Sequence, residues 1–472
     1  MESRQCPFAT SAAHSVPVLP VVIDPAGTDI QGEADRLRER GPAVPVVLPG
    51  GVRAWAVAGA AAAKRVMADP RVSKDPVRHW PAWTSGEVPA DWPLAMWVSI
   101  RSMFTAYGAD HTRLRKLVAG AFTMRRTTDL RPAVERVAEE LLDRIQADHG
   151  PDRPFDLRRA YAGPLPARVV CELFGVPDDM RDDLCEVFDR LFDTASDAAA
   201  VQDAAGRLYA MLTRLVAAKR ATPGDDLTSG LLDAQRAAAQ EEGAVPLAEQ
   251  ELLDTLVHLL SAGYETTVNL LDHAVHALLT HPGQLELIRT GRAEWADAVE
   301  ETLRWQPSAA NYMLRYAVED IDLDGVVVPK GDAILVSAAG AGRDPEVHGP
   351  DADRFDITRP TRARHVSFGH GAHHCLGAPL ARMEAAIGLE ALFRRFPRLA
   401  LAVPSEELRP LSSFISNGHR ELPLLPGRAA GTTDAATDAA AAAEADGPVA
   451  RIPAQAAPVC PYSGAARRPL AA

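Results

Sequence analysis

The feature that most limits the fold is a helical repeat of apolar residues, which runs through most of the chain between positions 111 and 396. It is clearest in four segments: Leu130–Asp148, Met180–Thr194, Ala204–Arg220 and Glu249–Leu279. Apolar residues three and four positions apart form one face of an amphipathic helix, and such faces are buried against one another. The pattern predicts a mainly α-helical protein.

Two shorter stretches predict β-structure. Val44–Leu48 and Trp55–Ala58 are apolar runs on either side of Gly50-Gly51, which is a hairpin signal. Met313–Val336 alternates apolar and polar residues, as strands with one buried face do. We therefore expect a small β region beside the helices.

The chain of 472 residues divides into three parts by composition. Residues 1–20 are irregular, residues 21–426 have the patterns of one compact domain, and residues 427–472 consist mainly of small and polar residues. Such a tail cannot bury enough surface to fold, so we expect it to be disordered. The start resembles no signal peptide, and no apolar run is long enough to span a membrane. These features predict a cytoplasmic protein.

The charge balance and the cysteines exclude several classes of protein. Fifty basic residues against 63 acidic ones give a net charge of −13, which argues against nucleic acid as a partner. No Cys-x-x-Cys pair occurs, so the sequence indicates neither a zinc ribbon nor a disulfide framework. We expect Cys171 and Cys185 to be buried apolar residues.

One loop combines three glycines with a cysteine. It reads Phe368-Gly-His-Gly-Ala-His-His-Cys375-Leu-Gly377, and a helical pattern follows at once. Glycine allows the backbone to approach a flat ligand closely. A helix that begins just after Cys375 directs its N–H groups at the sulfur and favours the thiolate. A thiolate on such a loop suits an axial ligand of haem iron.

Two other chemistries compete for this loop. His370, His373, His374 and Cys375 are potential zinc ligands, but four ligands within six residues do not easily surround one ion as a tetrahedron. A nucleophilic cysteine needs a base and an orienting acid, and the loop identifies neither clearly. A purely structural loop would not need three glycines and a thiol together.

The pattern Phe-Gly-x-Gly-x-His-x-Cys-x-Gly resembles the haem-binding signature of the cytochromes P450, the haem-thiolate monooxygenases. The resemblance covers about residues 20–426 and implies a triangular helical prism with a small sheet region. It also implies that Cys375 is the axial ligand of the iron in haem b. Further haem-contacting residues that it implies in this loop are Gly369, Gly377, Phe368 as the aromatic that shields the sulfur, and His373 as a ligand of a haem propionate.

Glycine and tandem threonines interrupt the pattern of the longest helix at Ala262-Gly-Tyr-Glu-Thr-Thr267. One interpretation is a packing position of small residues, with Thr266 bonded back to a carbonyl. The resemblance implies instead a local opening of the helix above the haem, lined by Ala262 and Gly263. Glu265 and Thr266 are then the acid–alcohol pair that supplies protons when dioxygen is activated.

Two further pairs gain a role only through the resemblance. His111 and Arg115 lie on one face of a predicted helix, and the family binds haem propionates there, with Arg315 as a third ligand. Glu301 and Arg304 share a helix face and match the family's core ion pair. Its third member is expected at Arg354, and we interpret this triad as structural.

The resemblance predicts insertion of one oxygen atom from dioxygen into a C–H bond of an apolar small molecule, such as a steroid, a terpenoid or a macrolide. The sequence is similar to an actinobacterial branch that acts on steroids and macrolactones. A peroxygenase that uses hydrogen peroxide, and a haem-based sensor without turnover, are the alternatives; neither needs the acid–alcohol pair.

The chain carries no Gly-x-Gly-x-x-Gly fingerprint for a flavin or nicotinamide cofactor. We therefore expect electrons from a separate ferredoxin and its NAD(P)H-dependent reductase, with the enzyme itself a monomer. The ferredoxin should be acidic, because basic residues are expected around the cysteine face. These are Arg113, Lys116, Arg362, Arg364 and Arg382.

Overall fold

The computed structural model describes residues 19–427, apart from residues 90, 91, 93, 123 and 193–197. The expectations of an irregular start and of a disordered tail concern almost entirely residues 1–18 and 428–472, which lie outside the described part.

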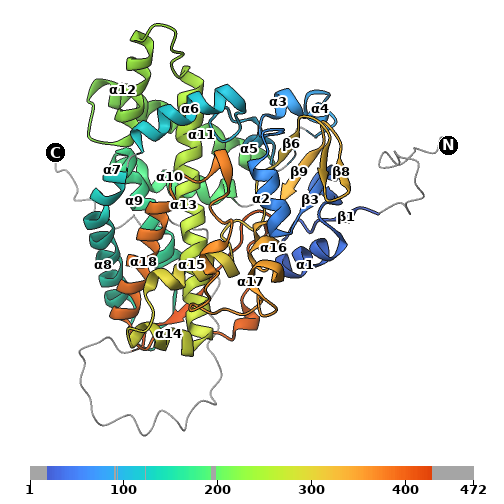
Figure 1. Ribbon diagram of the computed structural model, residues 1–472. Coiled ribbons are helices and arrows are strands. Elements are labelled where there is room, and N and C mark those ends of the chain that lie inside the picture. Colours follow the sequence, from blue (N-terminus) through green and yellow to red (C-terminus); the bar gives the residue numbers. More distant parts are fainter. Residues whose placement is uncertain (1–18, 90–91, 93, 123, 193–197, 428–472) are drawn as a thin grey trace, which may run out of the picture.

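Helices form most of the molecule, as the apolar repeat predicts, and Figure 1 shows a triangular outline. The α-helices are α1 (Ile30–Arg40), α2 (Ala60–Ala68), α3 (Pro76–His79), α4 (Pro81–Thr84), α5 (Ala95–Ser99), α6 (Gly108–Ala121), α7 (Met124–Asp129), α8 (Arg131–Asp148), α9 (Pro164–Phe174), α10 (Asp178–Phe192), α11 (Ala198–Ala221), α12 (Leu227–Gln240), α13 (Glu249–Thr280), α14 (Pro282–Arg289), α15 (Trp295–Trp305), α16 (Ala338–Gly342), α17 (Pro345–His348) and α18 (Ala378–Arg395). Short helical turns are η1 (Pro49–Gly51), η2 (Arg158–Ala162), η3 (Arg362–Arg364), η4 (Gly371–His373) and η5 (Ser405–Glu407).

The strands form one larger sheet, in the order β1-β2-β3-β9-β6-β4, and two small ones. They are β1 (Val21–Val22), β2 (Val44–Leu48), β3 (Val52–Val57), β4 (Val72–Ser73), β5 (Phe155–Asp156), β6 (Arg315–Ala317), β7 (Ile321–Leu323), β8 (Val326–Val328), β9 (Ala333–Val336), β10 (Ala400–Leu401) and β11 (Pro423–Leu425). The hairpin predicted at Gly50-Gly51 is present, because β2 and β3 pair antiparallel across η1. The β region lies beside the helices in Figure 1.

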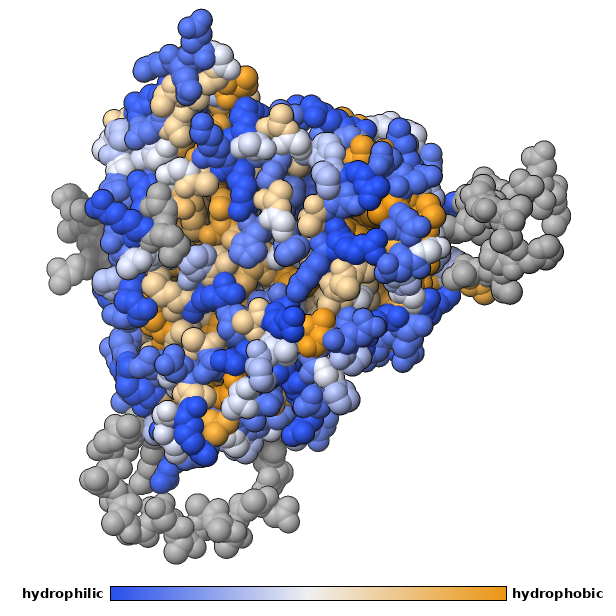
Figure 2. Space-filling view, in the orientation of Figure 1, coloured by the Kyte–Doolittle hydropathy of each residue, from blue (hydrophilic) through white to orange (hydrophobic). Residues whose placement is uncertain are grey.

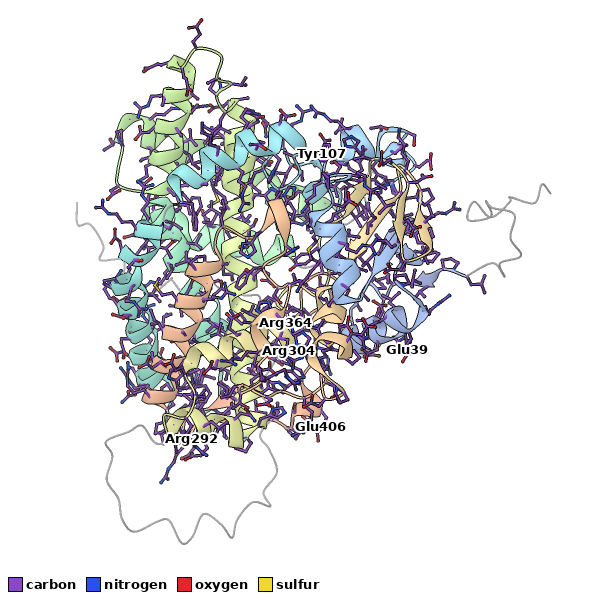
Figure 3. All side chains as sticks on the ribbon, in the orientation of Figure 1. Glu39, Tyr107, Arg292, Arg304, Arg364 and Glu406 are labelled. Carbon is purple, nitrogen blue, oxygen red and sulfur yellow. The ribbon has the colours of Figure 1, made fainter. Side chains whose placement is uncertain are left out.

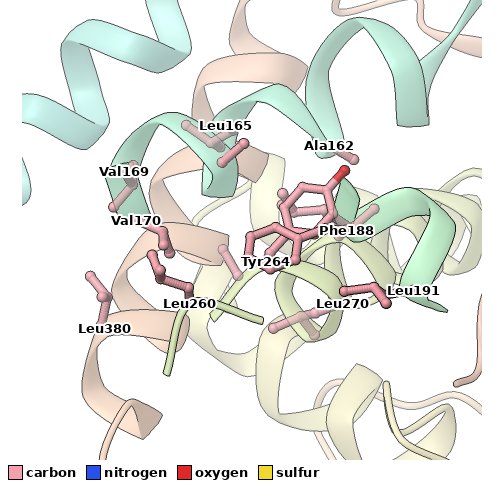
Figure 4. Close-up of a cluster of buried hydrophobic side chains, with 14 of the residues drawn as sticks. Ala162, Leu165, Val169, Val170, Phe188, Leu191, Leu260, Tyr264, Leu270 and Leu380 are labelled. Atoms are coloured by element: carbon pink, nitrogen blue, oxygen red, sulfur yellow. The ribbon is translucent and has the colours of Figure 1, made fainter. Parts of the chain in front are cut away.

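The long helix α13 forms the centre of the helical part and packs against α9, α11, α15 and α18. Its leucines face these neighbours: Leu252, Leu256 and Leu260 are fully buried. Figure 4 shows the contact with α9 and α10, where the Tyr264 ring stacks on Phe188 with centroids 5.8 Å apart. Burial on several sides fixes α13, so its remaining face can position functional groups rigidly.

The tryptophan-rich segment before α6 is a packed layer. Trp80 stacks on Tyr316 of β6 with centroids 5.1 Å apart, and on Trp83 at 6.0 Å. Trp92 donates a hydrogen bond to the carbonyl oxygen of Pro49 at 2.9 Å. These contacts fasten the segment to the sheet.

Figure 2 shows one face of the molecule, on which charged and apolar side chains are mixed. Among the described residues, no helix has the length and apolar character that crossing a membrane requires.

Candidate cofactor and active site

The cysteine loop is a tight turn that approaches other backbone closely. The N–H of Cys375 donates to the carbonyl oxygen of Phe368 at 2.8 Å. Gly369 and Gly371 have φ of 73° and 72°, which L side chains rarely adopt. A Cβ on Gly371 would lie 2.8 Å from the carbonyl oxygen of Met67. The glycines are therefore required both for the turn and for its packing on α2.

The Cys375 sulfur lies at the start of α18. Burial raises the pKa of its thiol, although backbone N–H groups of Gly377 and Ala378 and the charges of Arg115 and Arg382 act to lower it. The expected net shift toward the thiolate is thus wrong for the protein alone, because desolvation outweighs the helix start. The Cys375 side chain nevertheless retains solvent-accessible surface.

The structure brings together the four side chains expected at the propionates. The rings of His111 and His373 lie 4.0 Å apart. Arg115 donates to the carbonyl oxygen of His374 at 2.7 Å, and Arg315 is buried on β6. Burial lowers the pKa of His111 to about 4 and that of Arg315 to about 10.

A fifth basic residue, Lys74, belongs to this cluster, although no sequence motif indicated it. Its ammonium lies over the Phe104 ring, 3.3 Å from the centroid, and the residue is 4% exposed. Burial, and then the charge of Arg315, lower the pKa of Lys74 well below its ordinary value. Lys74 stands in the segment Arg71-Val-Ser-Lys-Asp75, and nothing in that segment distinguishes a buried lysine from an exposed one.

This basic cluster fits an anionic cofactor with two carboxylates. Burial lowers the pKa of His373, and the charged groups that lower it further are all basic: Lys74, His111, Arg315 and Arg115. In the described structure, the buried His111 Nε2 and Arg315 Nε have no hydrogen-bond partner. Buried donors and like charges at this density are costly unless an acidic group is bound among them.

In the middle of α13, two small side chains are not covered by neighbouring elements. Ala262 and Thr266 are exposed although their helical neighbours are buried. The predicted local opening of the helix is wrong: α13 is continuous, and the Thr266 hydroxyl donates to the carbonyl oxygen of Ala262 at 2.7 Å. Gly263 serves packing, since a Cβ there would lie 2.9 Å from the Val170 side chain on α9.

Glu265 is buried in a polar network on another side of α13. Its carboxylate accepts a hydrogen bond from Asn269 at 3.2 Å and lies 3.9 Å from the Arg158 guanidinium. Arg158 also bonds Asp272 at 2.9 Å. Burial acts to raise the pKa of Asp272, but His419 and Arg158 together hold it low. The Glu265 carboxylate and the Thr266 hydroxyl thus have different partners in this structure.

The core ion pair is present, with a different third member. The Glu301 carboxylate receives two hydrogen bonds of 2.7 Å from Arg304, and both side chains are fully buried. The expected Arg354 contributes only its carbonyl oxygen, which accepts from Arg304 at 2.9 Å. The side chain that reaches Glu301 is Arg359, with Nε 3.5 Å from Oε1. The prediction is corrected from Arg354 to Arg359.

The predicted basic patch is smaller than expected. Arg113 pairs with Glu251, Arg362 with Asp297, and Arg382 with Glu300. These carboxylates neutralise three of the five residues. Lys116 and Arg364 are exposed and form no ion pair within the described part of the chain.

Fold and site together define a mainly helical protein in which a cluster of buried basic side chains lies beside a cysteine turn. The profile of the family described as Cytochrome P450 matches residues 296–410. The chain is 45% identical over 412 residues to 2-hydroxy-5-methyl-1-naphthoate 7-hydroxylase of Streptomyces carzinostaticus, covering 87% of this chain and 98% of that protein. It is 37% identical to 6-deoxyerythronolide B hydroxylase of Saccharopolyspora erythraea, over 82% of this chain and 94% of that protein.

A solved structure gives the same result. CYP154A1 from Streptomyces coelicolor A3(2) superimposes with a TM-score of 0.78 and 52% identity, over 86% of this chain and 99% of that one. Testosterone-bound CYP154C4 from Streptomyces sp. ATCC 11861 superimposes with a TM-score of 0.82 and 42% identity, over 88% of this chain and 100% of that one. The chain belongs to the cytochrome P450 family. It is a monooxygenase that hydroxylates small apolar molecules, and the family implies haem.

Proposed function

We propose that the site holds haem b with Cys375 as the axial ligand of its iron. The observation that carries this is the basic cluster of five side chains beside a cysteine turn. Arg115, Arg315 and Lys74 bind the propionates as cations, and His111 and His373 bind them as neutral donors. The N–H groups of Gly377 and Ala378 stabilise the thiolate sulfur. Phe368 covers the loop, and the guanidinium carbon of Arg382 lies over its ring, 4.4 Å from the centroid of the Phe368 ring.

Haem, when bound, supplies the activation of dioxygen, and the protein controls substrate and protons. Ala262 is small and leaves room beside the cofactor. The Thr266 hydroxyl exchanges its bond to the Ala262 carbonyl for one to a group in the site, and passes on a proton. Glu265 supplies that proton from the buried network that contains Arg158 and Asp272. Substrate bound over this face excludes water.

The substrate is an apolar ring compound of the size of a steroid, a macrolactone or a naphthoate. The printed names of relatives include a naphthoate hydroxylase, a 6-deoxyerythronolide B hydroxylase and a protein with bound testosterone, and they support this range. The rings of Trp97 and Phe104, which lie against His258 of α13, have the apolar character that such a molecule needs.

Electrons come from an external acidic ferredoxin and its NAD(P)H-dependent reductase. Lys116 and Arg364 are the exposed cations that would attract it. A peroxygenase does not need this partner, and a sensor does not turn over; consumption of NAD(P)H with stoichiometric product distinguishes both from the proposal.

Replacement of the ligand tests the assignment. Cys375→Ser should abolish the carbon monoxide spectrum of a thiolate haem and the hydroxylation that depends on it. Cys171→Ser, at a buried cysteine of α9, is the matched control and should keep both. A thiolate spectrum that persists in Cys375→Ser refutes the proposed ligand.

A further inference from the structure

A buried histidine shares the α13 face that carries Ala262 and Thr266. His258 precedes Ala262 by one turn and Thr266 by two, and side chains four positions apart lie on the same side of a helix. His258 is 8% exposed while Ala262 and Thr266 are exposed, so it stands where the core meets the open face of the site. None of the roles proposed above uses it.

The ring of His258 is fixed by the aromatic wall opposite. Its Nδ1 lies 2.7 Å from the Ser102 hydroxyl oxygen. The Phe104 ring centroid is 4.5 Å from that of the imidazole, and the Trp97 centroid is 6.2 Å away. These contacts hold the imidazole between α13 and residues 97–104, so its second nitrogen has a defined direction.

The hydrogen-bond network favours one tautomer of His258. The Ser102 oxygen accepts the N–H of Phe104 at 3.1 Å, and among the described residues His258 Nδ1 is the acceptor within reach of the buried Ser102 hydroxyl hydrogen. Burial, and secondly the charge of Lys74, lower the pKa of His258 to about 3. The imidazole is therefore neutral at physiological pH, with its hydrogen on Nε2.

That Nε2–H group has no hydrogen-bond partner in the described part of the chain. Among the described residues nothing forms a hydrogen bond with Nε2, and the atom is not completely enclosed. A fixed donor in an apolar wall is the type of group that orients a ligand, because leaving it unpaired is costly.

We propose that His258 Nε2–H donates a hydrogen bond to a ketone or hydroxyl oxygen of the substrate, and thereby selects which end of an apolar ring system enters the site. This inference rests on the proposed function and narrows its substrate class. A neutral donor suits an uncharged oxygen, and α13 places that oxygen away from the carbon nearest to Thr266.

Three steroids test the proposal with the haem-loaded protein. They are androst-4-ene-3,17-dione and its two analogues that each lack one ketone, with dissociation constants from the substrate-induced Soret shift. We expect the dione to bind at least tenfold more tightly than one of the analogues. In His258→Phe, which keeps an aromatic ring between Trp97 and Phe104, the preference should fall to within twofold. Full retention of the preference in His258→Phe overturns the proposal.

Two further variants separate recognition from packing. Ser102→Ala removes the group that fixes the tautomer and should reduce the preference partly. His276→Phe changes a histidine of the same helix that bonds Ser405 instead, and it should keep the preference. A preference lost equally in His276→Phe counts against a specific role. Absence of a thiolate spectrum from the wild-type protein would refute the proposed function, whereas an unchanged preference with an intact spectrum refutes only the role of His258.

Discussion

The Arg158 guanidinium lies 3.9 Å from the Glu265 carboxylate, Nη2 to Oε1, and simultaneously bonds Asp272 at 2.9 Å. Asp272 in turn accepts from His419 at 3.0 Å. Glu265 is thus the inner end of a buried polar chain, and the longer of the two Arg158 contacts is the one easier to break. In the function proposed above, Glu265 draws on this chain for the proton that Thr266 passes on.

Replacement of Thr266 should uncouple turnover. Thr266→Ala removes the hydroxyl that is proposed to pass on the proton, so product formation should fall by about 10²–10⁴-fold. Consumption of NAD(P)H should continue with release of hydrogen peroxide. The ratio of product to peroxide per NAD(P)H is the measurement. Thr267→Ala, which removes a buried hydroxyl bonded to Gly263, is the control, and an unchanged ratio in Thr266→Ala refutes the role.

The two arginines near Glu301 should differ sharply in their effect on stability. Arg359→Ala removes a buried cation that contacts Glu301 and donates to Asp351, so unfolding free energy should fall by about 3–5 kcal/mol. Arg354→Ala keeps the carbonyl oxygen that Arg304 uses, and it should change stability by less than about 0.5 kcal/mol. Denaturant unfolding of both variants measures these changes. Equal losses of unfolding free energy would show that Arg354 is the third member of the ion-pair triad.

Lys74→Met should have opposite effects on the protein with and without haem. Without cofactor the charge is repelled by Arg315, so its removal should leave stability unchanged or raise it. With haem bound, a charged partner of the propionates is lost, and haem affinity should fall by roughly 10–100-fold. Transfer of haem to apomyoglobin measures the haem affinity, and thermal unfolding of the apoprotein measures the stability without cofactor. Lys330→Met, at an exposed lysine, is the control.

Charge reversal should identify the cations that a ferredoxin contacts. The double variant Lys116→Glu and Arg364→Glu should slow reduction by an acidic ferredoxin about tenfold at low ionic strength, and the difference should vanish in high salt. Arg292→Glu is the control, because Figure 3 places it at a distance from Arg364. Equal rates at low salt would exclude this surface.

Local patterns predicted much of the fold. The helix expected at Leu130–Asp148, the hairpin at Gly50-Gly51 and the long helix from Glu249 depend on apolar spacing and turn residues, which a sequence displays directly. The cysteine turn was predictable because its glycines are needed at positive φ, as Gly369 shows.

The missed features depend on distant neighbours. Arg354 and Arg359 lie in one irregular segment, and only the path of the backbone decides which side chain reaches Glu301. Lys74 is buried because β4 pairs with β6 beside it, a contact that links residues far apart in the chain. The pKa of Cys375 depends on the depth of burial, which the helix start alone did not indicate.

A buried acid on α18 should make stability depend on pH. Burial raises the pKa of Glu384 to about 8, and in the described structure its Oε1 has no hydrogen-bond partner. The folded state therefore binds a proton that the unfolded state, with an ordinary carboxyl pKa near 4.5, has already released. Stability should decrease as pH rises from about 4.5 to 8, by up to about 1.4 kcal/mol per pH unit, and then level off.

Glu384→Gln keeps the shape and cannot ionise, so it should stabilise the protein relative to wild type at pH 8.5 but hardly at pH 5. Thermal unfolding followed by loss of the thiolate Soret band at both pH values checks this, with Glu390→Gln on the exposed side of α18 as control. A stability difference that is the same at pH 5 and pH 8.5 would show that Glu384 does not titrate in this range.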